Sequence, residues 1–261
     1  MIRAMRTAAS GMFAQQMQVD ALANNISNAN TTGFKREALS FRSLLYRTYR
    51  HAGGTGGQNQ SNPTGLQVGS GVEVSSSHRL QVQGDLELTG RELDISISGN
   101  GYFALQMPNG ELRYTRDGSF RTDSNGAVVS VDGFLLQPPL TIPPGVTDVT
   151  IDQVGIVSGR TEDGGTAQLG EVRLYTFPND AGLEATGSNL FVETPSSGPA
   201  VARQPGDPGT GLLRQGFLER SNVQVVEELI ALISAQRNYE VNSRTIRVGD
   251  EMLQQISNLI N

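Results

Sequence analysis

The sequence predicts an α+β protein in which two long helices at the chain ends frame an all-β middle. Three patterns indicate this fold. Apolar residues recur at every seventh position near the C-terminus and at alternating three- and four-residue spacings near the N-terminus. Between them, short apolar runs alternate with turn dipeptides. We therefore expect the terminal helices to pair as a coiled-coil-like stalk that carries an inserted β-domain.

The first predicted helix runs from Ile2 to about Ala29. Its apolar stripe, interrupted at position 16 by a glutamine, consists of Ile2, Met5, Ala9, Met12, Val19, Ala23 and Ile26. The small residues of segment 7–11 and Gly249 near the other chain end predict close approach of two helices. Glycine inside a helix costs about 1 kcal/mol relative to alanine, which favours a packing reason for its presence. Tolerance of glycine in a solvated turn is the alternative.

An asparagine-rich segment follows, with four asparagines in seven positions, at Asn24, Asn25, Asn28 and Asn30. Asparagine side chains compete for backbone hydrogen bonds and so weaken helices. Gly33 can adopt the positive φ that ends a helix. From the residues alone, the segment is either a frayed helix end or a functional signature.

The middle of the chain is expected to be all-β. Residues 41–49 predict an extended or partly helical arm, and residues 51–60 predict a flexible glycine-rich loop. The alternation in residues 93–98 is that of a half-buried strand. Turn dipeptides then recur at hairpin intervals, at 100–101, 109–110, 117–118, 125–126 and 132–133.

Two short motifs in this middle resemble ligand sites without matching them. Residues 99–104 fit a dinucleotide fingerprint but lead into a strand, whereas that site needs a helix. Residues 123–126 resemble a calcium loop, yet no glutamate stands at the twelfth position, so a turn is favoured. His51 and His78 have no evident base partner and are expected to be ordinary surface residues.

The last predicted helix spans Ser221 to Asn261. Its seven-residue stripe consists of Val225, Leu232, Tyr239, Ile246, Leu253 and Ile260, with Val226, Leu229, Ile233, Met252 and Ile256 beside it. Ser221 and Gln224 predict a capping box. Gln236, Ser243 and Asp250 would fall on the flanking stripe and leave the seam half apolar. We therefore expect this helix to pack among many neighbours.

The composition excludes several classes of function. A net charge of −6 without a basic cluster argues against nucleic acid as a partner. The chain has no cysteine and only two histidines, which excludes thiol chemistry and a Cys/His metal site. No apolar segment is long enough to cross a membrane, and the N-terminal residues lack the apolar run of a secretory signal. No catalytic residue, cofactor or metal is predicted.

Several of these segments resemble the bacterial flagellar axial proteins, the rod and hook family. Residues 22–35 fill every position of the N-terminal signature, a Leu-Ala-Asn-Asn-Ile-Ser/Ala-Asn core followed by a Thr-x-Gly-Phe/Tyr-Lys turn. Segments within 221–240 match the closing signature, with mild departures at Leu229 and Asn238. Residues 114–120 match a hairpin of the family. The 51–60 loop together with the turn at 63–69 resembles the distal-rod branch.

The resemblance implies a structural subunit that polymerises helically into the distal rod, the drive shaft that transmits torque to the hook. It implies export by the flagellar type III apparatus without a cleaved signal peptide, and a place in the part of the basal body that spans the periplasm. Expected partners are further copies of the chain, proximal-rod and hook proteins, surrounding ring proteins that act as a bushing, and the export apparatus. The alternatives are a hook or proximal-rod paralogue, or a secreted β-rich enzyme acting on cell-wall polymer.

Self-assembly residues are predicted on both helices and in the signature turn. They are Ile2, Met5, Met12, Val19, Asn24, Asn25, Ile26, Asn28, Gly33, Phe34, Val225, Leu229, Leu232, Tyr239, Ile246, Leu253 and Ile260. Four segments are expected: an N-terminal assembly helix at 1–32, an extended arm with the loop at 33–70, a β-rich domain at 71–216 and a C-terminal assembly helix at 217–261.

Overall fold

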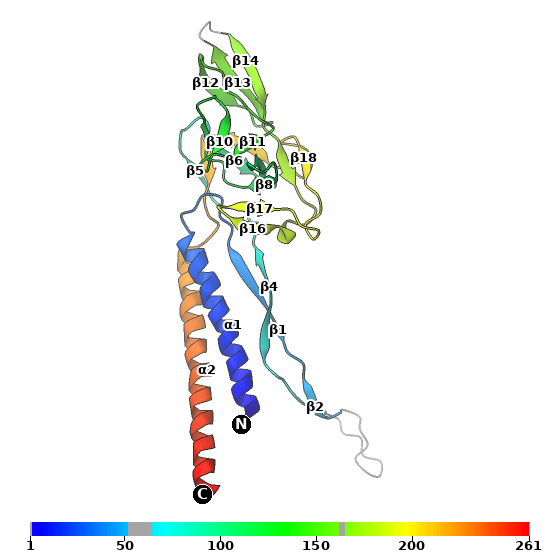
Figure 1. Ribbon diagram of the computed structural model, residues 1–261, viewed down its shortest axis with the longest axis vertical. Coiled ribbons are helices and arrows are strands. Elements are labelled where there is room, and N and C mark those ends of the chain that lie inside the picture. The colour runs from blue at the N-terminus through cyan, green and yellow to red at the C-terminus, as the bar shows by residue number, and fades with distance from the viewer. Residues whose placement is uncertain (1, 52–63, 162–164, 261) are drawn as a thin grey trace. The chain divides into compact units, whose positions relative to one another are not determined.

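A computed structural model describes residues 2–51, 64–161 and 165–260, and at 257, 259 and 260 the backbone alone. The α+β prediction is confirmed, with an N-terminal helix, many strands and a C-terminal helix (Figure 1). Internal contacts divide the chain into two units. The helical unit comprises Met1–Ile26, Glu37–His78 and Val225–Asn261, and the β unit comprises Ser27–Arg36 and Arg79–Gln224. The predicted 51–60 loop falls, apart from position 51, outside the described residues.

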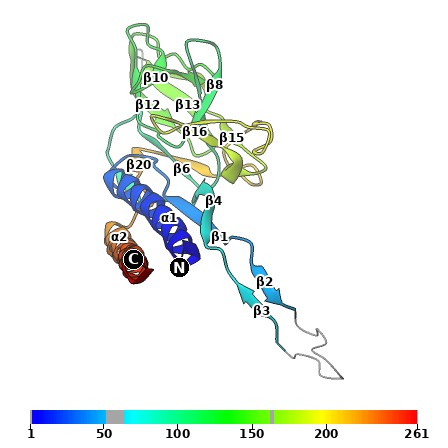
Figure 2. The ribbon, with the colours of Figure 1, turned by 60° about the horizontal axis from the view of Figure 1, so that its bottom comes forward.

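The helical unit contains two long helices and a β ribbon. Helices α1 (Ile2–Ser27) and α2 (Val225–Ile260) lie side by side in both views (Figures 1 and 2). The ribbon consists of β1 (Glu37–Ser43) paired with β4 (Val72–Arg79), and β2 (Arg47–Arg50) paired antiparallel with β3 (Leu66–Val68). Residues 41–49 were predicted to form an extended or partly helical arm, and the structure shows the extended form.

The start of α2 differs from the prediction. The helix begins at Val225, and the Ser221 hydroxyl accepts a hydrogen bond from the Val223 amide at 3.3 Å. The predicted capping box at Ser221 and Gln224 is therefore wrong, because Ser221 lies four residues before the helix. Glu227 and Glu228 occupy the first turn instead, where negative charge interacts favourably with the helix dipole.

The β unit is built around a seven-stranded antiparallel sheet in the order β16-β17-β8-β7-β11-β10-β9. Its strands are β7 (Phe103–Gln106), β8 (Leu112–Thr115), β9 (Phe120–Thr122), β10 (Val128–Ser130), β11 (Leu135–Gln137), β16 (Glu184–Gly187) and β17 (Leu190–Val192). A three-stranded sheet joins β12 (Val146–Ile151), β13 (Ile156–Thr161) and β14 (Thr166–Glu171).

Three further strand pairs complete the β unit. They are β15 (Leu174–Thr176) with β18 (Val201–Arg203), β19 (Leu212–Gln215) with β6 (Ile95–Ser98), and β20 (Phe217–Glu219) with β5 (Leu86–Leu88). A short 3₁₀ helix, η1 (Asp180–Gly182), precedes β16.

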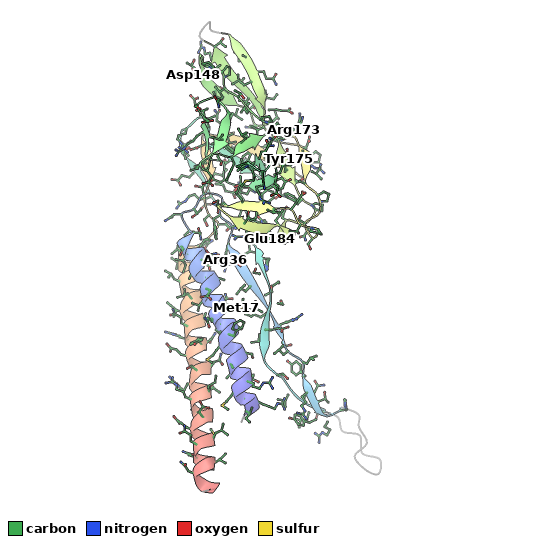
Figure 3. All side chains as sticks on the ribbon, viewed as in Figure 1. Met17, Arg36, Asp148, Arg173, Tyr175 and Glu184 are labelled. Atoms are coloured by element: carbon green, nitrogen blue, oxygen red, sulfur yellow. The ribbon has the colours of Figure 1, made fainter. Side chains whose placement is uncertain are left out.

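The β unit has its own apolar core. Aliphatic residues and two phenylalanines form the larger cluster, in which Ile97 and Phe103 are fully buried. A second cluster is aromatic, with the Tyr114 ring edge-on to Phe177 at 4.8 Å between centroids. Tyr175, labelled in Figure 3, packs on Tyr114 at 5.6 Å. Removing these apolar and aromatic side chains from water supplies the favourable free energy that drives folding of the β unit.

The predicted turns are largely observed. Gly110, Gly126 and Gly133 adopt positive φ values of 85°, 76° and 83° after their Asn or Asp partners. Residues 99–104 lead into β7, so the dinucleotide interpretation does not apply. The Asp123 carbonyl accepts the Gly126 amide at 2.8 Å, which makes 123–126 a turn as expected. Within the described residues, neither helix is apolar enough over a sufficient length to cross a membrane.

Candidate assembly site

Helices α1 and α2 pack antiparallel in a fixed register. Met5 lies against Gly249, Gly11 against Asn242, and Asn25 against Glu228. The residue numbers of these opposed positions add to 253 or 254, so the register is constant over more than 20 residues of α1. The last turns of α2, from about residue 252, have no α1 residue opposite them in this register. The helix pair is thus a continuous seam followed by a single helix.

Two glycines allow the helices to approach closely. A Cβ added at Gly11 would lie 3.0 Å from Asn242 Nδ2, and one added at Gly249 would lie 3.0 Å from Met5 Cγ. Both distances are shorter than ordinary van der Waals contacts. The prediction that Gly249 and the small residues near Gly11 mark a close approach is confirmed.

The flanking stripe of α2 differs from the prediction. Seven-residue positions Leu232, Ile246 and Leu253 are half-buried, as expected for a covered stripe. The stripe that accompanies them is one residue earlier than predicted, at Glu228, Ala235, Asn242 and Gly249. Gln236 and Asp250 are exposed, so the predicted flanking stripe is wrong at these two positions, whereas Ser243 is half-buried as predicted. The seven-residue spacing alone fits either set of positions, and contact with α1 selects the smaller side chain at two of them, Ala235 over Gln236 and Gly249 over Asp250.

Asn25 joins three segments of the helical unit. The side chain is 1% exposed, and its amide group donates to the Glu37 carbonyl at 2.9 Å and to Glu228 Oε2 at 3.1 Å. Its amide oxygen accepts the Glu37 backbone N–H at 2.9 Å. Asn25 therefore satisfies both backbone groups of the first residue of β1 while it contacts α2. This position is ordered by specific hydrogen bonds, which excludes the frayed-end interpretation for Asn25.

The predicted residues of α1 divide between its faces. Met5, Met12, Val19 and Ile26 are half-buried and share a seven-residue spacing. Ile2 is 67% exposed, and Ala9 and Ala23 are exposed too, so these three do not belong to the seam within the chain. Asn24 is exposed and Asn28 is half-buried. The side chains that α1 buries most deeply are Ala8, Ala14, Leu22 and Asn25, because α1 contacts both α2 and the ribbon.

The predicted residues of α2 also divide. Val225, Leu229 and Tyr239 are 41%, 44% and 41% exposed. Ile260 lies at the end of the described helix, and its side chain is outside the description. Side chains project all around both helices (Figure 3). A large share of the apolar surface on α2 is thus left without cover in a single chain.

Gly33 and Phe34 of the signature turn lie in the β unit. Gly33 adopts a φ of +69°, and a Cβ there would lie 2.7 Å from the Asp117 backbone nitrogen. Its own amide donates to the Glu219 carbonyl at 2.8 Å. Phe34 is 5% exposed, with the Arg79 guanidinium 5.4 Å from its ring centroid. Only glycine fits this position without strain.

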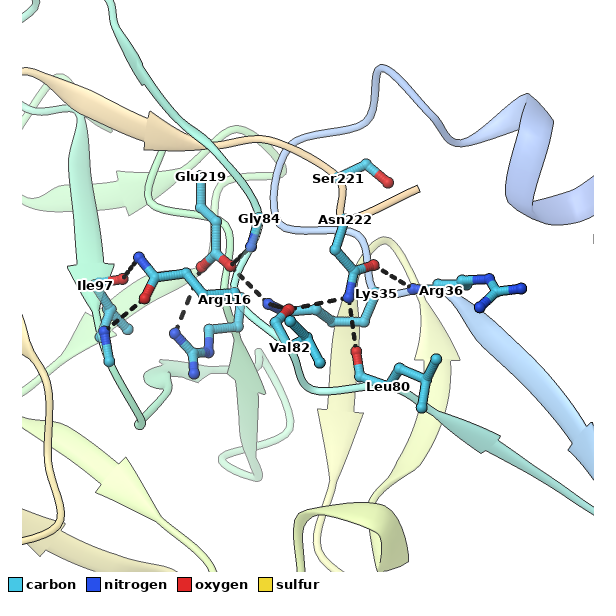
Figure 4. A network of polar contacts seen from close by, with 12 residues as sticks. Lys35, Arg36, Leu80, Val82, Gly84, Ile97, Arg116, Glu219, Ser221 and Asn222 are labelled. Atoms are coloured by element: carbon cyan, nitrogen blue, oxygen red, sulfur yellow. Dashed lines mark hydrogen bonds and ion pairs between the residues drawn. The ribbon is translucent and has the colours of Figure 1, made fainter. Parts of the chain in front are cut away.

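Lys35 forms a buried ion pair with Glu219 (Figure 4). Both side chains are 1% exposed or less, and Lys35 Nζ donates to Glu219 Oε1 at 2.6 Å and to the Val82 carbonyl at 2.8 Å. The Gly84 amide donates to Glu219 Oε1 at 2.9 Å, and Arg116 Nη1 donates to Glu219 Oε2 at 3.5 Å. Burial lowers the pKa of Lys35 from its usual value, and the charge of Glu219 opposes this shift.

Asn222 ties the chain before α2 to the chain after α1 (Figure 4). Its amide group donates to the carbonyls of Leu80 at 2.8 Å and Val82 at 2.9 Å, and its oxygen accepts the Arg36 amide at 2.7 Å. Together with the Gly33–Glu219 bond, this contact holds residues 33–36 beside residues 219–222. The two segments that lead to the helices are therefore fixed next to each other within the β unit.

Sequence reasoning missed Lys35, Glu219, Asn222 and Glu228 as site residues. A lysine in the middle of a turn gives no local sign of burial, because its partner stands 184 positions later. The signal that existed was the match of the signature turn and of segment 221–223 to the family pattern.

Comparison with known proteins identifies the family. Family models match three parts of the chain: the flagella basal body rod protein at residues 5–35, the flagellar hook protein FlgE/F/G D1 domain at 96–159, and the C-terminal part of the flagellar basal body rod FlgEFG protein at 214–259. The flagellar basal-body rod protein FlgG of Caulobacter vibrioides is 47% identical over 99% of both chains. The chain belongs to the FlgG family of flagellar basal-body rod proteins.

Other FlgG relatives agree along the full length. FlgG of Borreliella burgdorferi is 44% identical and FlgG of Bacillus subtilis 36% identical, each over 99% of both chains. The solved structure of the Helicobacter pylori flagellar hook protein FlgE2 matches with a TM-score of 0.25 at 15% identity, over 70% of this chain and 43% of that chain, too weakly to compare the folds. The resemblance predicted from the sequence is confirmed, and with it a structural subunit of the basal-body rod.

Proposed function

We propose that the chain polymerises helically into the distal rod of the flagellar basal body and transmits torque to the hook. The observation that carries this proposal is the exposed apolar surface of α2 in a full-length FlgG-family chain. Val226, Ile230 and Val241 are 70%, 61% and 61% exposed. Exposed apolar stripes of this length mark interaction surfaces, and polymerisation would cover them in every subunit.

The predicted self-assembly residues fit this proposal in two groups. Those of the seam, such as Met12 and Ile246, would hold α1 and α2 together as a coiled-coil-like stalk. Those on exposed positions, such as Ile2 and Leu229, would meet neighbouring copies. Gly33 and Phe34 would act indirectly, because they fix the chain segments from which the helices continue.

The remaining expectations complete the proposal. The chain would be exported unfolded by the flagellar type III apparatus without a cleaved signal peptide, and would assemble where the rod spans the periplasm. Its partners would be proximal-rod, hook and ring proteins. We also propose that the chain is not an enzyme, since its relatives are named as rod proteins. The four predicted segments, 1–32, 33–70, 71–216 and 217–261, remain proposed boundaries.

The test is electron microscopy of the purified chain at increasing concentration, with a peptidoglycan hydrolysis assay alongside. Tubular polymers without hydrolysis support the rod subunit, whereas hydrolysis by a monomer supports the cell-wall enzyme. A hook or proximal-rod paralogue is less favoured, because the full-length matches at 36–47% identity are to FlgG.

A further inference from the structure

Helix α2 carries a second, regularly spaced stripe outside its seam with α1, although Val241, Arg244, Val248 and Met252 of this stripe also border a groove with Ala4 and Met5 of α1. At about 100° per residue, the positions on this side include eight at spacings of three and four residues, with Glu251 beside them. They are Val226, Ile230, Ile233, Arg237, Val241, Arg244, Val248 and Met252. The six apolar members are between 40% and 70% exposed. We call these eight residues the outer α2 stripe.

Helix α1 also has an exposed stripe, on the side turned away from its contacts with α2 and the ribbon. Its members recur at spacings of four and three and are all exposed: Ile2, Arg6, Ala9, Phe13, Gln16, Asp20 and Ala23. Phe13 is 63% exposed, an unusual position for a large aromatic side chain. We call these seven residues the outer α1 stripe.

Charges on the two helices are complementary in one direction only. Arg6 and Asp20 lie fourteen positions apart on α1, and Arg237 and Glu251 lie fourteen positions apart on α2, all exposed. In an antiparallel arrangement, Asp20 meets Arg237 while Arg6 meets Glu251. In a parallel arrangement the same alignment would bring like charges together, which is unfavourable.

The same antiparallel alignment also matches the apolar positions. Ala9 falls opposite Val248, and Phe13 falls opposite Arg244, between Val241 and Val248. The aromatic ring would gain apolar contact from the valines and a cation–π contact from the guanidinium. Paired residue numbers then add to 257, one helical turn away from the register of the seam within the chain.

We propose that the outer α1 stripe of one copy docks antiparallel on the outer α2 stripe of a second copy, with Asp20 against Arg237 and Arg6 against Glu251. A second copy is required because within one chain α1 meets α2 through a different face. The contact joins two different surfaces, so each added copy leaves one of each free, and the assembly grows as an open helix wherever the rotation between copies does not close a ring. This inference rests on the proposed function and names the surfaces that would serve it.

A charge exchange tests the contact in the full-length chain. Asp20→Arg alone and Arg237→Asp alone would each place like charges together and raise the critical concentration for polymerisation roughly fivefold or more. The double variant Asp20→Arg with Arg237→Asp restores the opposite pair and should return the value close to that of the unmodified chain. Gln236→Glu, at an exposed position about 100° around the helix from Arg237, is the matched control and should have little effect.

Three results would overturn the contact. If neither single variant changed the critical concentration, these two faces would stay in solvent. If the increases in critical concentration of the two single variants added up in the double variant, the pairing of Asp20 with Arg237 would be excluded. A loss with Arg237→Asp but not with Asp20→Arg would indicate that α2 meets α2 of another copy.

Disulfide trapping separates this inference from polymerisation itself. The chain has no cysteine, so an equimolar mixture of Ala9→Cys and Val248→Cys chains offers one thiol per copy. Under mild oxidation the proposal predicts a dimer that contains one of each variant. Dimers from Ala9→Cys alone, or none in the mixture, would contradict it. An unmodified chain that never polymerises would count against the proposed function, while the mixed dimer would still report on the contact.

Discussion

At the residue scale, the structure around position 33 explains why the signature turn contains a glycine there. The positive φ of +69° and the 2.7 Å distance from an added Cβ to the Asp117 nitrogen are two separate demands for glycine. The Lys35 side chain, two residues later, is buried and pairs with the Glu219 carboxylate, which also pairs with Arg116. This turn is therefore a structural part of the β unit.

Gly33→Ala should lower the free energy of unfolding of the β unit by about 2 kcal/mol or more, because it adds backbone strain and a clash with backbone atoms. Thermal unfolding followed by near-ultraviolet circular dichroism measures this change. Gly110→Ala is the matched control. Gly110 also has a positive φ, of 85°, but nothing lies within 4 Å of its added Cβ. Equal losses at the two positions would show that the close contact at Gly33 contributes nothing.

Lys35→Met should cost about 3–5 kcal/mol, because it leaves the Glu219 carboxylate buried with the Gly84 amide and, as its positive partner, the more distant Arg116. Chemical denaturation of the full chain measures the change. Arg220→Met is the control, since Arg220 pairs with Glu87 at 3.6 Å where both side chains are more than half exposed. A loss for Lys35→Met no greater than for Arg220→Met would contradict the buried pair.

At the scale of elements, the sequence predicted both helices because their apolar periods are long and regular. The bounds of α1 were right to within two residues, whereas α2 starts four residues later than predicted. The flanking stripe of α2 could not be predicted, because only contact with α1 decides between Asn242 and Ser243. The role of Asn25 could not be predicted either, since its partners Glu37 and Glu228 stand 12 and 203 positions away.

Leu232→Ala combined with Leu253→Ala should raise the critical concentration for polymerisation sharply and leave the melting of the β unit unchanged. Both leucines are half-buried on α2, and each truncation of a leucine that assembly buries costs about 2–5 kcal/mol in every subunit. Sedimentation and circular dichroism measure the two effects. Gln236→Ala, at an exposed position of the same helix, is the control. A lower melting temperature of the β unit would instead place α2 in its core.

At the scale of the whole molecule, the chain combines a β unit with a core of its own and a helical unit with exposed apolar faces. The family could be recognised from residues 22–35 and 221–240, because these segments combine turn chemistry with helix periodicity. Contacts across the chain explain why the two signatures occur together: Asn25 of the first donates to Glu228 of the second at 3.1 Å, and Lys35 pairs with Glu219, two residues before the second begins.

Concentration-dependent polymerisation of the full-length chain tests the central claim most directly. Sedimentation should find monomers below a critical concentration and large particles above it, and electron microscopy of those particles should show straight tubes with helical symmetry. A chain that stays monomeric at every concentration, with its apolar helix faces in solvent, would contradict the account.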